Sequence, residues 1–122
     1  MAPGDGTVST LAGKGGDAGY VEGKGASARF NGPRGLALDA DNNLIVADRG
    51  NHCIRRITTD NGHVTMVAGR AEHAGFADDD TGHHIALFNH PCGIAVDGDN
   101  ILLVADTANH RIRFVHMCVE RE

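Results

Sequence analysis

Two stretches of this chain repeat each other, and the repeat limits the fold more than any other feature of the sequence. Residues 8–13 return as residues 64–69, an offset of 56, and residues 30–55 return as residues 88–113, an offset of 58. The first pair of stretches is identical at 3 of 6 positions and the second at 16 of 26. A chain of 122 residues has the length of one domain, so the two copies are units of one repeat architecture.

Each copy predicts short strands separated by turns rich in Asp, Asn and Gly. The expected strands of the first copy cover residues 35–39, 44–48, 52–58 and 63–68, and those of the second cover residues 94–97, 101–106 and 111–116. The run at 44–48 is apolar nearly throughout, which is typical of a strand buried on both faces. Four antiparallel strands in tandem repeats favour an all-β fold of two four-stranded antiparallel β-propeller blades.

The repeat resembles the NHL repeat, which builds β-propellers. A Pro-x-Gly-apolar-Ala-apolar-Asp segment stands at 33–39 and at 91–97. An apolar-Val-Ala-Asp segment stands at 45–48 and 103–106, and Asn-x-x-Ile-Arg stands at 51–55 and 109–113. The resemblance implies a ring of about five or six blades, whereas this chain carries two. It also implies a module that binds other molecules, as many NHL propellers are.

The order of the strands predicts an assembly of several chains. We expect a tail at 1–7, a first repeat at 8–62, a second at 63–117 and a tail at 118–122. Each repeat begins with an outer strand, so residues 8–12 form an orphan outer strand and the second blade lacks one. Three chains joined head to tail would close a six-bladed ring, so a homotrimer is favoured over a fragment of a longer propeller.

Polar positions filled identically in both copies are expected to support the blade. They are Asp39, Asp48, Asn51, Arg55, Asp97, Asp106, Asn109 and Arg113. Asp48 and Asp106 can accept backbone N–H bonds, and the two asparagines suit a left-handed turn position. The two arginines are expected to pair either with these carboxylates or with the neighbouring blade. Asp39 and Asp97 begin stretches that resemble a calcium loop, but the required acidic twelfth residue is missing, so hairpin turns are favoured.

The glycine-rich loop of the second copy carries the candidates for a metal or ligand site. They are His73, Asp78, Asp79, Asp80, His83, His84 and His90. Imidazole and carboxylate groups bind first-row metals, but no spacing here fixes a geometry. A solvated polar loop is the favoured interpretation, so no cofactor is expected and a divalent metal is the alternative. His52 and His110 recur at one blade position and would face the ring of a closed propeller, where they could bind an anion or a metal.

The composition limits the classes of molecule that this chain is expected to bind. A net charge of −5, a pI near 5.8 and an aromatic content of one Tyr and four Phe disfavour nucleic acid. Neither a membrane span nor a secretory signal is visible, and three cysteines without a C-x-x-C pair predict an intracellular, cytoplasmic protein.

The favoured function is a non-catalytic module that binds a protein or small ligand through its loop surface and channel mouth. A metal-dependent lyase or hydrolase is the alternative, and RNA binding is less favoured.

Overall fold

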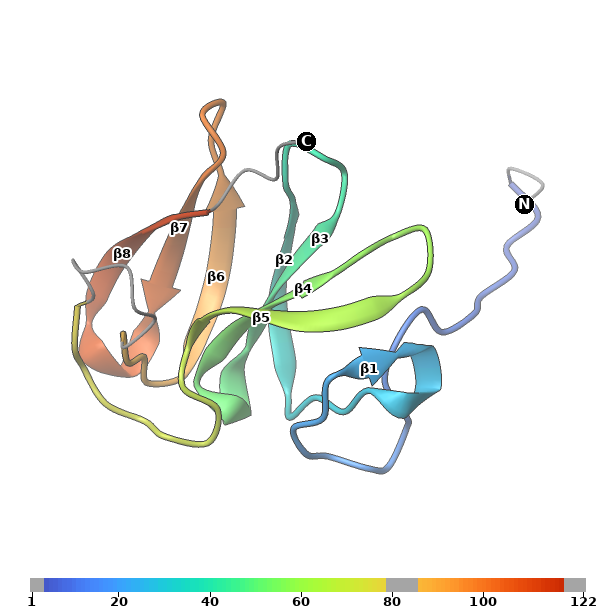
Figure 1. Cartoon of the computed structure of the whole chain (residues 1–122), viewed down its shortest axis with the longest axis horizontal. Helices are drawn as coiled ribbons and strands as arrows, with labels where there is room; N and C mark the ends of the chain where they lie inside the picture. Colours follow the sequence, from blue (N-terminus) through green and yellow to red (C-terminus); the bar gives the residue numbers. More distant parts are fainter. Residues whose placement is uncertain (1–3, 79–85, 118–122) are drawn as a thin grey trace.

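The computed structural model of the chain describes residues 4–78 and 86–117, which form two antiparallel sheets (Figure 1). The first sheet has the strand order β1 (Gly23–Lys24), β5 (His63–Gly69), β4 (Cys53–Ile57), β3 (Leu44–Asp48) and β2 (Pro33–Leu38). The second has the order β6 (Pro91–Val96), β7 (Ile101–Asp106) and β8 (Arg111–His116). The all-β prediction is confirmed, and the strands lie where the repeat places them.

Three short 3-10 turns complete the regular structure of the described residues: η1 (Gly25–Ser27), η2 (Arg49–Asn51) and η3 (Thr107–Asn109). None of the helical turns within 4–78 and 86–117 has the length or apolar character needed to cross a lipid bilayer.

The hairpin between β2 and β3 follows the expected Asx chemistry. The Oδ1 atom of Asp39 accepts hydrogen bonds from the backbone N–H groups of Asp41 and Asn43, both at 2.9 Å. Asn42 between them has φ 63°, a left-handed conformation that asparagine tolerates. Asp97 closes the hairpin between β6 and β7 in the same way. Both segments are therefore β-hairpin turns rather than calcium loops.

The N-terminal stretch and the outer edges of the two sheets differ in how their backbones are paired. Residues 8–12 belong to no strand within this chain, and Val8 is 92% exposed. At the outer edge of the first sheet, Gly23 and Lys24 pair with Val64 and His63. This two-residue strand was not predicted from the sequence. In the part of the chain that the structure describes, β8 has no outer neighbour.

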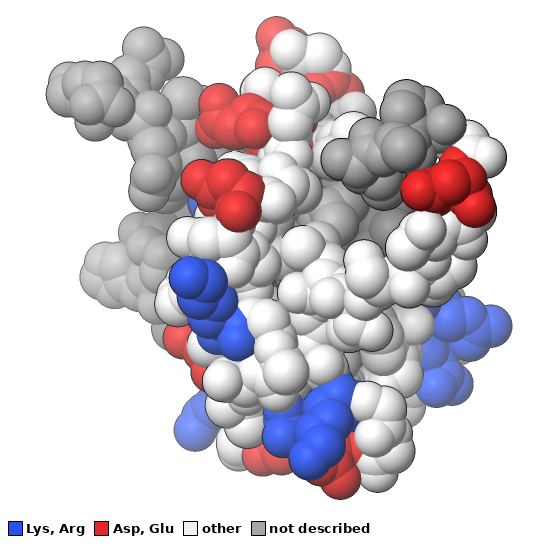
Figure 2. All heavy atoms as spheres, turned by 90° about the vertical axis from the view of Figure 1, so that its right-hand side faces the viewer, with Lys and Arg blue, Asp and Glu red and all other residues white. Residues whose placement is uncertain are grey.

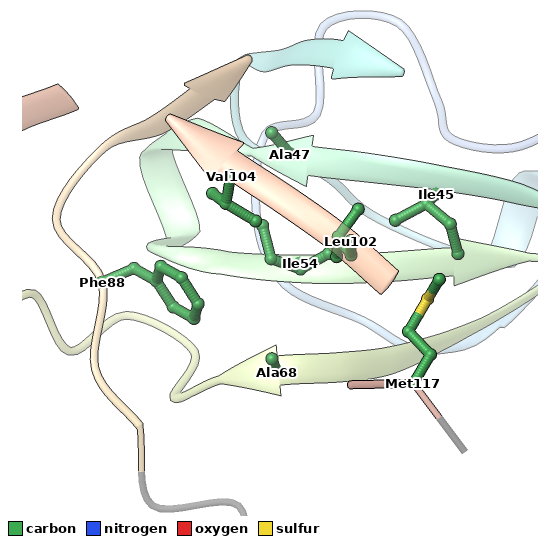
Figure 3. Close-up of a cluster of buried hydrophobic side chains, with 8 residues drawn as sticks. All are labelled: Ile45, Ala47, Ile54, Ala68, Phe88, Leu102, Val104 and Met117. Carbon is green, nitrogen blue, oxygen red and sulfur yellow. The ribbon is translucent and has the colours of Figure 1, made fainter. Parts of the chain in front are cut away.

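The two blades pack face to face through one apolar cluster (Figure 3). Its buried members are Ile45, Ala47, Ile54, Ala68, Phe88, Leu102, Val104 and Met117. The inner strands β2 and β6 also come very close, since a Cβ atom added to Gly35 would lie 2.2 Å from the carbonyl oxygen of Cys92. The blades are thus held together by buried apolar area and by an inner contact that only glycine permits.

A second cluster covers the other face of the first blade. Ala28, Val46, Ile57 and Val64 are buried there, with Phe30 packed against them. Val46 lies in this cluster, while its neighbour Ile45 lies in the cluster between the blades. β3 is therefore buried on both faces, as its apolar run predicts.

Candidate functional site

The most buried polar group of the first blade is an Asp–Asn–Arg anchor formed by Asp48, Asn51 and Arg55. Asp48 ends β3, Asn51 lies in the turn η2, and Arg55 returns on β4, so the tight turn brings the three together. Arg55 Nη1 and Asn51 Nδ2 both donate to Asp48 Oδ2, at 2.9 and 2.8 Å. All three residues are at most 1% exposed. A buried ion pair of this kind depends on further hydrogen bonds to its members, and backbone carbonyl oxygens supply them to Nη1 and Nη2 of Arg55, whereas its Nε has no partner among the described residues.

The rest of the anchor holds the glycine-rich loop that precedes β2. Arg55 donates to the carbonyl oxygens of Arg29 (2.5 Å) and Val21 (2.8 Å). Asn51 donates to the carbonyl oxygen of Gly19 at 2.8 Å. The planar guanidinium fork suits several fixed acceptors at once. The anchor therefore fixes both roots of the loop to the blade.

The second blade repeats the arrangement with Asp106, Asn109 and Arg113. Arg113 Nη1 donates to Asp106 Oδ2 at 2.6 Å and to the carbonyl oxygen of Leu87 at 2.9 Å. Arg113 Nη2 donates to the carbonyl oxygen of Ala77 at 2.8 Å. The loop that carries Ala77 and Leu87 joins the two blades, so the second anchor also fixes one blade to the next.

Aromatic rings stack on the guanidinium group of each anchor. The Cζ atom of Arg55 lies 4.3 Å from the ring centre of Tyr20 and 4.6 Å from that of Phe30. Arg113 lies 4.7 Å from the ring centre of Phe88 and 4.6 Å from that of Phe76. These contacts add a cation–π attraction to the ion pair. This role of the aromatic residues was not predicted, although Gly-Tyr at 19–20 and Gly-Phe at 75–76 share the 56-residue offset and could have indicated it.

The paired roots locate the extra length of the second loop. Val21 and Ala77 are equivalent at an offset of 56, whereas Arg29 and Leu87 are equivalent at an offset of 58. The two additional residues therefore lie between Ala77 and Leu87.

The prediction for the two asparagines needs a correction. Asn51 and Asn109 do not take the left-handed turn position, which belongs instead to His52 (φ 58°) and His110 (φ 56°). The physical reason is the anchor itself. Each asparagine keeps its amide beside the neighbouring carboxylate, as Asn51 does beside Asp48, so the reversal of the chain falls on the next residue.

His52 is part of the contact between the blades. Its Nδ1 atom accepts a hydrogen bond from the backbone N–H of His90 at 3.0 Å, and the two rings meet edge to face with centres 4.5 Å apart. Burial lowers the pKa of His52 below its ordinary value of 6.5, and the neighbouring His90 and Arg49 act in the same direction. His110, the equivalent residue of the second blade, is exposed.

This bond predicts that the blade contact weakens in acid. Protonation of His52 turns Nδ1 from an acceptor into a donor facing another donor. Because the folded-state pKa lies below the unfolded value, the unfolding free energy is highest above about pH 6.5 and falls as the pH decreases below it. Urea unfolding of single chains between pH 7.5 and 5 should show a smaller loss for His52→Asn than for the parent chain. His110→Asn is the control and should behave like the parent. Equal losses in all three would contradict the assignment.

The loop candidates for a metal site are held separately where the structure describes them. His73 Nδ1 lies 2.8 Å from the carbonyl oxygen of Ala71, and Asp78 pairs with Arg113 at 3.0 Å. His90 contacts His52. Within residues 4–78 and 86–117, no group of three or more His, Cys, Asp or Glu side chains could hold a metal ion. The remaining candidates, Asp79, Asp80, His83 and His84, lie outside the described residues.

The cysteines of the described ranges offer no reactive thiol at the anchor. Cys53 is free and buried, and Cys92 is free and half-buried. Burial, with the nearby Asp48 carboxylate, raises the pKa of the Cys53 thiol to about 12. Burial and the nearby Glu22 raise the pKa of Tyr20 to about 12 as well. Both groups stay protonated at neutral pH.

A groove of ≈ 690 Å³ runs between β5 and β8. Met66 and Ala68 line it on one side, and Arg111, Phe114 and His116 line it on the other. It lies along the edge of β8, where the second blade has no outer strand among the described residues. The sequence predicted the missing strand but not the groove.

Comparisons with known proteins identify the same two repeats. The family model of the NHL repeat matches residues 30–57 and 88–113. NHL repeat-containing protein 2 of Bos taurus is 36% identical over 104 residues, which is 81% of this chain and 14% of that protein. Protein SUPPRESSOR OF QUENCHING 1, chloroplastic, of Arabidopsis thaliana is 31% identical over 79% of this chain and 9% of its own length. The chain thus spans about a seventh or less of these curated relatives.

A solved structure shares the arrangement of the strands. An auxiliary nutrient binding protein from Bacteroides thetaiotaomicron superposes with a TM-score of 0.75 and 34% sequence identity. The match covers 86% of this chain and 27% of the other chain. The two sheets therefore have the form of a β-propeller fragment.

Proposed function

The chain belongs to the NHL-repeat proteins, and we propose that it works as a non-catalytic propeller module that binds a protein or a small ligand. The binding surface would be the loops and the mouth of the central channel. The proposal rests on the contacts that the repeated polar residues make. Every repeated Asp, Asn and Arg of the anchors is occupied in holding loop roots, which leaves the loops as the surface that varies between the copies.

The comparisons support a binding role. The superposed protein from Bacteroides thetaiotaomicron is described as an auxiliary nutrient binding protein, and a propeller module that binds a small ligand fits that likeness. The matched relatives are much longer than this chain, and the proposal does not extend the activities of those whole proteins to it.

We further propose that the module self-associates head to tail. The supporting features are the edge of β8, which has no outer strand among the residues that the structure describes, and the exposed apolar side chains on the outer blade faces. These side chains include Leu36, Leu38, Ile112 and Phe114. Three chains would supply six blades, a ring size that propellers adopt.

A metal-dependent lyase or hydrolase is the competing function, and metal content separates the two. Protein purified without chelators or a histidine tag should contain well under one transition-metal ion per chain by mass spectrometry of the elements. Titration with Zn²⁺ or Mn²⁺ should show no stoichiometric binding in calorimetry. A bound ion at one per chain would instead favour the enzyme, because imidazole and carboxylate groups are the ligands that such catalytic metals take.

RNA binding has less support. The face on the side of β1 carries positive and negative side chains around a largely uncharged centre (Figure 2), rather than one basic surface. The net charge of −5 opposes a phosphate backbone as well.

A further inference from the structure

The edge of β8 is the place in the described structure where a blade is open. In the first blade, β4 is covered by β5 with the pairs Ile57↔Val64, Arg56↔Thr65 and Ile54↔Ala68. β8 is the equivalent of β4 at the 58-residue offset, and it carries the groove instead of a strand. Among the described residues, β8 therefore lacks the partner strand that β5 provides for β4.

Residues 8–13 are similar in sequence to β5. The segment Val-Ser-Thr-Leu-Ala-Gly matches residues 64–69 of β5, Val-Thr-Met-Val-Ala-Gly, in the Val, Ala and Gly positions. The segment belongs to no strand. Its C-terminal residue, Gly13, donates its backbone N–H to the carbonyl oxygen of Gly25 at 3.1 Å. Figure 1 shows the N-terminal segment and β8 on opposite sides of the molecule. The segment lies far from the open edge of its own chain.

We propose that residues 8–13 of one chain add to β8 of a second copy as its outer strand. The inference rests on the self-association proposed above and gives it a register. Transferring the β4–β5 pairs by the two offsets places Val8 of the first chain opposite Val115 of the second copy, with Ser9 opposite Phe114 and Ala12 opposite Ile112. Backbone pairing supplies the affinity of such strand addition, and alternate side chains fill the groove.

The apolar faces beside this edge fit the same contact. Ile54 of the first blade is 0% exposed because the second blade packs on it, whereas its equivalent Ile112 is 69% exposed. On the opposite end, Leu36 is 60% exposed, whereas its equivalent Ile94 packs against the cluster between the blades. The contact between chains would thus repeat the contact within the chain.

Polar groups at the contact also have equivalents. His52 accepts the backbone N–H of His90 within the chain, and His110 of one chain would accept the N–H of Gly32 from the next. Asn100 accepts the backbone N–H of Ala40 at 3.0 Å, and its equivalent in the first blade, residue 42, is also asparagine. The hydrogen bonds of the inner contact therefore have matching donors and acceptors on the outer faces.

Disulfide cross-linking of the full chain tests the register. In a Cys118→Ser background, the pair Val8→Cys with Val115→Cys and the pair Ser9→Cys with Phe114→Cys place two thiols opposite each other. Facing residues of antiparallel strands lie within disulfide reach. The pair Val8→Cys with Phe114→Cys is one residue out of register and points to opposite faces. Each in-register pair should give about tenfold more covalent trimer on a non-reducing gel than this control, because a one-residue slip turns the thiols apart.

Light scattering of the parent chain separates this inference from the proposed assembly. The expected mass is that of three 12.8 kDa chains, 38.4 kDa. A trimer in which neither in-register pair cross-links would overturn the strand addition and leave the self-association standing. A mass of 12.8 kDa at high concentration would overturn both. Cross-linking in a closed assembly of another size would support the strand addition and overturn the count of six blades.

Discussion

Arg55→Met should lower the free energy of unfolding by about 3–5 kcal/mol, the usual cost of removing one partner from a buried ion pair. The substitution leaves the Asp48 carboxylate buried without its cation, and it frees the carbonyl oxygens of Val21 and Arg29. Methionine keeps most of the side-chain volume, so the loss reports on charge and hydrogen bonds rather than on a cavity. Urea unfolding followed by circular dichroism measures it.

Two variants make this result specific. Arg34→Met carries the same change on β2 at an exposed position and should shift the free energy by less than about 0.5 kcal/mol. Arg55→Lys keeps the positive charge but loses the planar fork and the stacking with Tyr20 and Phe30, so its stability should fall between those of the parent and Arg55→Met. If Arg55→Met were as stable as Arg34→Met, the anchor would not hold the loop.

Gly35→Ala should destabilise the fold by about 1–3 kcal/mol or more, as overpacking of a close contact does. The new methyl group would meet the carbonyl oxygen of Cys92 at 2.2 Å and the Cα atom of Gly93 at 3.2 Å. Both are backbone atoms, so β2 and β6 must move apart and the cluster between the blades loosens. Thermal and urea unfolding of the variant measure the loss.

Gly93→Ala is the matched control at the equivalent position of the second blade. Its methyl group would meet only the Cβ atom of Ala105 at 3.5 Å, an ordinary contact, so the single chain should keep its stability. In the proposed ring, Gly93 would take the place that Gly35 has within the chain. We therefore expect Gly93→Ala to remain folded at a mass of 12.8 kDa. A Gly35→Ala chain as stable as Gly93→Ala would contradict the close inner contact.

The fold was predictable because its strands carry local signals. The repeat, the Asx turns and the apolar run of β3 placed every strand from β2 to β8 within a few residues. β1 escaped because Gly23 and Lys24 have little strand propensity and pair only through their tertiary position beside β5.

The anchor was predictable in part. Repetition singled out Asp48, Asn51 and Arg55, and the pairing of the carboxylate with the arginine was one of two arrangements that their charges allowed. Their targets in the loop did not follow, because the carbonyl oxygens of Gly19 and Val21 belong to the backbone and leave no mark in a sequence. The turn position of His52 was missed for a related reason, since the bond that holds Asn51 is set by the folded blade.

The place of the two extra residues in the second loop bears on how such a chain can diversify. Arg113 clamps the loop at Ala77 and at Leu87, and the length between these two points differs from that of the first loop while the clamp does not. Closing a longer loop costs little, about 0.6 kcal/mol for each doubling of its length. Evolution or a protein engineer can therefore graft new peptide between Ala77 and Leu87 and select it for new ligands, much as antibodies vary a hypervariable loop on a constant framework.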